Sequence, residues 1–224
     1  MHPKKHRPPF EDPLELLPRG LTKLNSLWVR WFYPFASIGR DVSFHFTSTL
    51  PRSRSTRIHI GNSVSLSANA WLGVATEDPT GEPILVLDDN CHIGPGTVIS
   101  AKNRIHLERD VLVGPVVIIV DHNHAYEDTT MPIIDQGITE GGTIRIGQGT
   151  WIGHGAAILC PRGELTIGRN CVIVANSLVM QSMPDYSVAA GYPATIIRQY
   201  DPERRAWCAG GNRAEAVPQI LTRF

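Results

Sequence analysis

The chain has 224 residues, of which 42% are hydrophobic, so it can bury one large core or two small ones. Lysine and arginine total 21, as do aspartate and glutamate, and this neutral balance gives no reason to expect nucleic acid as a partner. The four cysteines (Cys91, Cys160, Cys171 and Cys208) form no CxxC or zinc-like spacing, so we interpret them as reduced, buried thiols of a cytoplasmic protein.

Residues 1–31 are predicted to form an N-terminal segment that caps the next domain. Its opening, MHPKKHRPPFEDPLELLPRG, is basic but has no uninterrupted apolar stretch, so we expect no secretory signal. Apolar residues then recur at mostly helical spacing in LTKLNSLWVRWFYPF, residues 21–35. We predict a capping helix, with peripheral membrane contact as a weaker alternative. No apolar run reaches the ~18 residues that a membrane span needs.

An aliphatic residue recurs at every sixth position within groups along residues 32–186. The first group is weaker and contains Ile38 and Phe44, with Phe32 as a candidate third member. The first positions of the clear hexads are Ile60, Leu66, Leu72, Leu87, Ile93, Ile99, Leu107, Val113, Ile119, Ile146, Ile152, Ile158, Ile167, Ile173 and Val179. The fifth positions are small or β-branched, and Cys91 and Cys171 at such positions are expected to fill the core.

The period breaks only after every third hexad, so three hexads make one turn of a solenoid and every insertion leaves from the same corner. The sequence therefore predicts an all-β parallel solenoid of about five to six coils. Its largest insertion is a loop at 120–143, and a C-terminal extension follows at 187–224. A small bulge is expected around Pro161 to Glu164.

The largest insertion contains DHNHAYEDTTMPIIDQGITEGG, residues 121–142, with two histidines among acidic residues. An imidazole titrates near neutrality and suits a general base. Histidines two residues apart on an extended segment also face the same side, and with nearby carboxylates they can bind a metal ion. The residues of this loop leave both interpretations open.

Two further motifs make the chain resemble the hexapeptide-repeat acetyltransferases, over roughly residues 32–198. GTWIGHGAAIL (149–159) and VAAGYPATIIR (188–198) are similar to the family signatures WIGxGAxI and VxAGxPAxxIR. The resemblance implies a left-handed parallel β-helix, acetyl-CoA as co-substrate without a metal, and a homotrimer with active sites between subunits. The long loop is closest in pattern to O-acetyltransferases of O-antigen, capsule and exopolysaccharide synthesis, and to the maltose and galactoside branch.

The resemblance also implies roles for individual residues. His124, in HAYED (124–128), takes the place of the catalytic histidine, with His122 as the competing choice. Asp121, Tyr126 and Asp128 are expected near the substrate, and either aspartate could orient the imidazole. The residues expected along CoA are Trp151, His154, Ala175, Asn176, Ser177, Tyr192, Pro193 and Arg198. The family's Thr-Lys-Asp is replaced by residues 180–182, Met-Gln-Ser, which removes a phosphate-pairing lysine.

We therefore expect direct acetyl transfer to a hydroxyl of a saccharide or of a small-molecule or lipid-linked glycan precursor. The alternatives are a metal-dependent lyase of the γ-carbonic-anhydrase type, an N-acetyltransferase or xenobiotic acetyltransferase, and a non-catalytic β-helix scaffold. Any membrane contact is expected to be peripheral at most.

Overall fold

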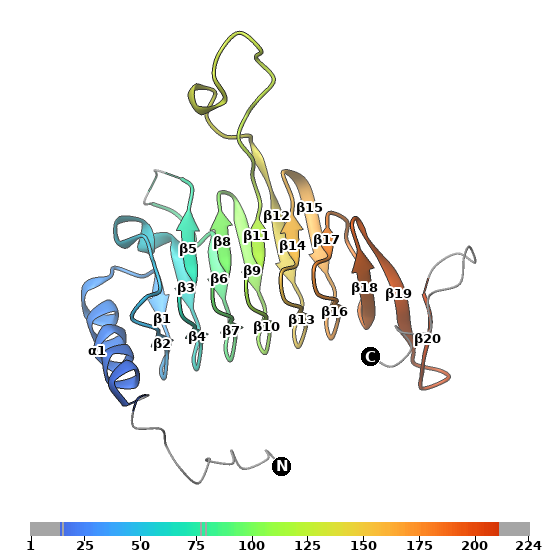
Figure 1. The fold of residues 1–224 in the computed structure, drawn as a ribbon, viewed down its shortest axis with the longest axis horizontal. Helices are drawn as coiled ribbons and strands as arrows, with labels where there is room; N and C mark the ends of the chain where they lie inside the picture. The colour runs from blue at the N-terminus through green and yellow to red at the C-terminus, as the bar shows by residue number, and fades with distance from the viewer. Residues whose placement is uncertain (1–13, 15, 77, 79, 211–224) are drawn as a thin grey trace.

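The molecule is a prism of stacked coils with a helix at its N-terminal end and a β-hairpin extension at its C-terminal end (Figure 1). The computed structural model describes residues 14, 16–76, 78 and 80–210. The expectations for residues 1–13 and for the tail 211–224 lie outside the described residues. Among the described helices, none is both long and apolar enough to cross a membrane.

The N-terminal helix α1 spans Leu16–Phe32, so it begins earlier and ends earlier than the predicted 21–35. It packs on the first coil through a narrow face, where Val29 is buried and the Asn25 side-chain amide donates to the carbonyl oxygen of Phe44 at 3.1 Å. Phe32 is the last residue of this helix and is exposed, so it is not a ladder residue of the solenoid.

Three sheets form the walls of the prism. Sheet A contains β1 (Ser37–Ile38), β3 (Ile58–Ile60), β6 (Leu85–Leu87), β9 (Arg104–Leu107), β12 (Gly141–Ile146) and β15 (Arg162–Ile167). Sheet B contains β2 (Ser43–Phe44), β4 (Ser65–Leu66), β7 (His92–Ile93), β10 (Leu112–Val113), β13 (Trp151–Ile152), β16 (Val172–Ile173), β18 (Ser187–Gly191), β19 (Ala194–Asp201) and β20 (Ala206–Ala209). Sheet C contains β5 (Trp71–Val74), β8 (Val98–Ala101), β11 (Ile118–Val120), β14 (Ala157–Leu159) and β17 (Leu178–Val179). Two short 3₁₀ helices, η2 (Arg52–Arg57) and η3 (Ile133–Asp135), lie in the insertions.

The predicted first positions of the hexads pair in register along each wall. In sheet A the paired row is Ile38, Ile60, Leu87, Leu107, Ile146 and Ile167. In sheet B it is Phe44, Leu66, Ile93, Val113, Ile152, Ile173 and Ala189. In sheet C it is Leu72, Ile99, Ile119, Ile158 and Val179. All but Ile38 are buried, so these rows form the continuous apolar core that the periodicity predicts.

In the first two hexads of each triplet, the fourth position turns the corner with a positive φ, a feature that the hexad pattern alone did not predict. This conformation is costly for most L-residues, and asparagine, aspartate and glycine adopt it most readily. The residues concerned are Ser63, Asn69, Asn90, Gly96, Asp110, Val116, Gly149, Gly155, Asn170 and Asn176. The β-branched Val116, with φ 56°, is the strained exception in this series.

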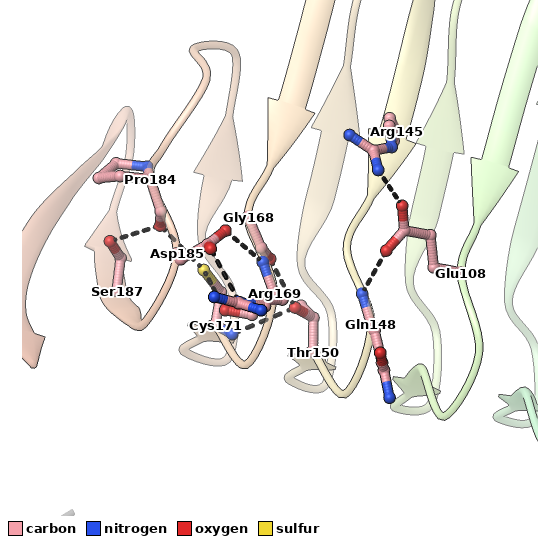
Figure 2. Close-up of polar contacts among 10 residues, drawn as sticks. All are labelled: Glu108, Arg145, Gln148, Thr150, Gly168, Arg169, Cys171, Pro184, Asp185 and Ser187. Atoms are coloured by element: carbon pink, nitrogen blue, oxygen red, sulfur yellow. Dashed lines mark hydrogen bonds and ion pairs between the residues drawn. The ribbon is translucent and has the colours of Figure 1, made fainter.

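The fifth positions point into the prism, as predicted, and some tie one coil to the next. At the corner between sheets A and B, the Thr150 hydroxyl donates to Gly168 O at 2.9 Å and accepts from the Cys171 backbone N–H at 3.1 Å (Figure 2). Cys91 and Cys171 are buried core residues, and burial raises the pKa of the Cys91 thiol to about 12. Cys160 is also buried, whereas Cys208 on β20 is half-exposed, which corrects the expectation of four buried thiols.

Polar contacts on the outside of the same corner join further coils. Glu108 pairs with Arg145, and its other oxygen accepts the Gln148 backbone N–H at 2.9 Å (Figure 2). On the next coils, Arg169 Nε lies 2.9 Å from Asp185 Oδ2. These contacts fix the corner between sheets A and B, which lies away from the long loop.

Strands β15 and β18 show how the chain runs at the predicted bulge and at the start of the predicted C-terminal extension. Of the residues expected to form a bulge, 162–164 are part of β15, because β12 is equally long and pairs with it from Gly141↔Arg162 to Ile146↔Ile167. The C-terminal extension does not separate from the solenoid at residue 187, because β18 adds to sheet B in parallel with β16. Only β19 and β20 turn back, as antiparallel strands.

We expect Ile119→Ala to lower the free energy of unfolding by about 2–5 kcal/mol, because it opens a cavity in the fully buried row of sheet C. Ile118→Ala, one residue earlier on β11 and 43% exposed, is the matched control and should cost much less. Urea unfolding at one fixed protein concentration measures both changes. Equal losses would contradict the inward assignment of Ile119.

Candidate active site

The long loop leaves the corner between sheets C and A, between the end of β11 and the start of β12, and projects beyond the prism (Figure 1). Its base is an antiparallel stem. Thr139 N donates to Asn123 O at 2.8 Å, and Asn123 N donates to the Thr139 hydroxyl at 3.0 Å. One step further out, Ala125 N donates to Gly137 O at 3.1 Å. Both histidines therefore lie on a hydrogen-bonded stem near the rigid solenoid.

Asp121, the first residue of the loop, is completely buried. Its carboxylate accepts the backbone N–H groups of Lys102, Asn103 and Arg104 at 2.8, 2.9 and 3.0 Å. These donors belong to the turn between β8 and β9 and to the first residue of β9, on the preceding coil. A buried carboxylate needs such partners to offset its lost hydration, and here they anchor the root of the loop to the coil beneath it.

The same carboxylate also holds His122. His122 Nδ1 lies 2.9 Å from Asp121 Oδ1, and the histidine side chain is only 12% exposed. Because a carboxylate can only accept a hydrogen bond, this contact places a proton on Nδ1. Nε2 is then the nitrogen that can take up a proton from another group. In this structure Asp121 therefore contacts the turn and His122, in the position from which a carboxylate can orient the imidazole.

His124 lies in a different environment. It forms an antiparallel bridge with Ile138 through its backbone, and its side chain is exposed. No hydrogen bond or ion pair joins its imidazole to another of the residues that the structure describes. The two histidines therefore differ in their contacts: the buried carboxylate of Asp121 contacts His122 and not His124.

The other expected substrate residues lie further out on the loop. Asp128 accepts hydrogen bonds from the Thr130 N–H at 2.8 Å and from the Thr130 hydroxyl at 2.6 Å, which lower the pKa of its carboxyl group. Its backbone N–H and carbonyl oxygen are both bound by the Gln136 side chain, at 3.0 and 2.8 Å. Asp128 therefore shapes the tip of the loop and does not orient either histidine. Tyr126 is exposed beside it.

The turn at Lys102 and Asn103 is a part of this site that motif reasoning did not identify. Besides capping Asp121, this turn holds the returning strand of the stem: Lys102 Nζ donates to Thr139 O, and Asn103 Nδ2 donates to Glu140 O at 2.8 Å. The two chain segments are 37 residues apart, so only the stacking of coils brings them together.

The residues expected along CoA lie on sheet B and at its corner with sheet C. Trp151 is half-exposed and starts a row that runs through Val172 and Val188 to Arg198, each paired with the next. Strands lie about 4.8 Å apart, so this row extends over roughly 14 Å of the outer face. Tyr192 and Pro193 form the turn between β18 and β19 at the end of the sheet, where both are exposed.

The corner between sheets B and C carries His154, Ala175 and Asn176, which are all exposed. Asn176 N donates to His154 O at 2.8 Å, so these residues occupy successive coils of one column. The side chain of Ser177 instead points into the prism, where its hydroxyl is buried without a hydrogen-bond partner. The whole residue is only 2% exposed, and its carbonyl oxygen accepts the Ala157 N–H at 2.8 Å.

Within one chain, the loop and the expected CoA residues lie on different parts of the prism. The loop joins the coil of β9–β11 to the coil of β12–β14, and Trp151 lies on that second coil, so both are at the same height. However, the loop leaves the corner between sheets C and A, whereas Trp151 faces outward from sheet B. A single prism therefore does not bring His122 and Trp151 together.

Two proteins of known sequence are similar to the chain over most of its length. No family model matches it. A Mycobacterium tuberculosis protein named "Probable acetyltransferase" is 34% identical over 185 residues, which cover 82% of this chain and 55% of that protein. The Escherichia coli protein named "Putative lipopolysaccharide biosynthesis O-acetyl transferase WbbJ" is 31% identical over 152 residues, which cover 65% of this chain and 76% of that protein.

The chain belongs to the hexapeptide-repeat acetyltransferase family. It spans little more than half the length of the mycobacterial relative. Among solved structures, AntD, an N-acyltransferase from Bacillus cereus in complex with dTDP and 3-hydroxybutyryl-CoA, superposes with a TM-score of 0.62. That match covers 81% of this chain and 89% of AntD at 18% identity, so it concerns the fold. The predicted left-handed parallel β-helix of this family is confirmed.

A metal site needs several ligand side chains close together. Among the described residues of one chain, we find no such group of three or more histidine, cysteine, aspartate or glutamate side chains. His122 and Asp121 contact each other, whereas His124 and Asp128 each lie apart from that pair. The loop of one chain therefore offers a histidine–carboxylate pair and not a ligand cluster.

We expect Asp121→Asn to lower the free energy of unfolding by about 1–3 kcal/mol, because an amide nitrogen replaces one oxygen among buried N–H donors. The matched control is Asp128→Asn, whose exposed side chain keeps an oxygen for Thr130 and should change stability by under about 0.5 kcal/mol. Urea unfolding followed by circular dichroism compares the two. If Asp121→Asn leaves the free energy of unfolding unchanged, the hydrogen bonds of Asp121 do not stabilise the fold.

Proposed function

We propose that the protein is an acetyl-CoA-dependent O-acetyltransferase that transfers the acetyl group directly to a hydroxyl of a saccharide or glycan precursor. Its family membership and a relative named as an O-acetyl transferase support the reaction class. The observation that carries the proposal is the pair at the root of the loop, where buried Asp121 fixes the tautomer and orientation of His122. The acceptor is a saccharide hydroxyl, either free or on a nucleotide or lipid carrier.

His122 is the general base of this proposal, in place of His124. A sugar hydroxyl has a pKa far above 7, so its proton must be removed as its oxygen attacks the thioester carbonyl carbon. Nε2 of His122 takes that proton, and the buried carboxylate of Asp121 stabilises the imidazolium that forms. When the carbon–sulfur bond breaks, His122 returns the proton to the CoA thiolate. No covalent enzyme intermediate is required.

The outer face of sheet B is the proposed CoA site. Trp151 gives an apolar surface for the pantetheine arm, and Arg198 lies at the far end of the same row. Asn176 and His154 border the row at the neighbouring corner. Arg169, another arginine of these coils, is already paired with Asp185, and position 181 is glutamine. Arg198 is the arginine that lies on the row itself, so we assign the phosphate contacts to that end of the row.

We further propose that the active unit is a homotrimer. His122 and Trp151 are at the same height but on different parts of one prism, as described above. A second copy placed side by side with its axis parallel can bring its sheet B to the loop of the first copy. Three copies related by a threefold axis would close such contacts into a ring, with one shared site at each junction.

We expect His122→Ala to lower kcat about 10²–10⁴-fold, with little change in KM for acetyl-CoA, because a general base acts on the chemical step. His124→Ala is the matched control, two residues along the same stem, and should retain most of the activity. The measurement is thiol release from acetyl-CoA, first over a panel of monosaccharides, oligosaccharides and sugar nucleotides to find the acceptor. A larger loss in His124→Ala than in His122→Ala would reverse the assignment.

We expect Trp151→Ala to raise KM for acetyl-CoA about tenfold or more while kcat changes little, because it removes contact area along CoA away from the reacting atoms. Trp71→Ala is the control, since Trp71 is a similarly exposed tryptophan on sheet C. Gel filtration with light scattering checks that both variants keep the parent mass. An unchanged KM in Trp151→Ala would place CoA elsewhere.

A further inference from the structure

Helix α1 packs on the solenoid with its polar side. Asn25 Nδ2 donates to the carbonyl oxygens of Phe44 and His45 at 3.1 and 3.3 Å. The Ser26 hydroxyl accepts the Phe44 N–H at 2.9 Å. Val29 is the only side chain of this helix that is buried among those described. The first coil is therefore covered by hydrogen-bonding side chains and one valine, and the apolar side of α1 is left to face outward.

The outward side of α1 is a broad apolar arc. Successive residues of an α-helix are about 100° apart around its axis, so the six large apolar residues of this arc cover about 140° of the helix circumference. They are Leu17, Leu24, Leu27, Trp28, Trp31 and Phe32. Trp31 is 80% exposed, Leu17 71% and Leu24 65%. The rings of Trp28 and Phe32 contact each other in a tilted arrangement, with centroids 4.1 Å apart. The chain itself thus leaves this arc in contact with water, which is unusual for a soluble domain.

Positive charge is concentrated at the same end of the molecule. Residues 16–60 contain seven lysines and arginines and one aspartate, a formal charge of 7 − 1 = +6, whereas the whole chain has 21 − 21 = 0. Helix α1 contains Arg19, Lys23 and Arg30 and no acidic residue. At about 100° per residue, these three lie together on one flank, between the packed side and the apolar arc. Lys23 and Arg30 also line a hollow beside the helix, together with Arg40 and one acidic residue, Asp41.

We propose that α1 docks the protein onto an anionic phospholipid membrane. The helix would lie in the plane of the surface, with Trp28, Trp31 and the leucines at the boundary between headgroups and acyl chains. The flank with Lys23 and Arg30 would face the lipid phosphates. A wide apolar arc with tryptophans, an adjoining basic flank and no acidic residue are the features of interfacial helices. A contact between two copies through this face would instead bring two positively charged ends together.

Co-sedimentation with vesicles tests the proposal. The full chain is mixed with vesicles of phosphatidylcholine and phosphatidylglycerol at 3:1, or of phosphatidylcholine alone, at low and high salt. We expect binding to the anionic vesicles that weakens with salt, because exposed charges are screened. The double variant Trp28→Ser and Trp31→Ser should bind at least tenfold more weakly, and Lys23→Gln about fivefold more weakly.

Trp207→Ser is the matched control, since Trp207 is an exposed tryptophan on β20 at the other end of the molecule, and it should bind as the parent does. His122→Ala should also bind normally, which separates this proposal from the proposed function. Circular dichroism confirms that each variant is folded. Parent protein that fails to bind anionic vesicles overturns the proposal. Unchanged binding by the double variant, with a lower mass by light scattering, also overturns it and assigns the face to a contact between copies.

Discussion

The register between successive coils is the constraint on which the rest of this structure depends. Parallel backbone hydrogen bonds align the first hexad position of each coil with that of the next, and the aliphatic side chains at these positions fill the prism. Once the register is set, every outward residue also has a defined place. Insertions can then occur only at a corner, because an added residue inside a strand would turn the whole inward row outward.

The long loop shows how such an insertion is made without disturbing the core. The carboxylate of its first residue, Asp121, accepts three backbone N–H groups on the preceding coil. These hydrogen bonds replace the hydration that the carboxylate loses on burial. The same carboxylate orients His122. One buried carboxylate therefore anchors the insertion and also holds the imidazole of the proposed base against the rigid part of the molecule.

The two ends of the molecule use different means to close the solenoid. At the C-terminal end, β18 continues sheet B, and β19 and β20 extend it in antiparallel order. At the N-terminal end, α1 covers the first coil with Asn25 and Ser26 and turns its leucines and tryptophans outward. The zero net charge of the chain conceals the positive charge of this end, so the total composition was a poor guide to what this surface can bind.

The sequence by itself determined the repeat, the three walls, the inward rows and the corner from which the loop leaves, because a period of six with strict breaks has few other physical solutions. It also identified the two candidate histidines. Only the tertiary structure shows that their surroundings differ, because the N–H donors that hold Asp121 beside His122 come from Lys102 to Arg104 on another coil. The tertiary structure likewise decided which side of α1 packs, since helical spacing predicts an amphipathic helix but not the surface that each side meets.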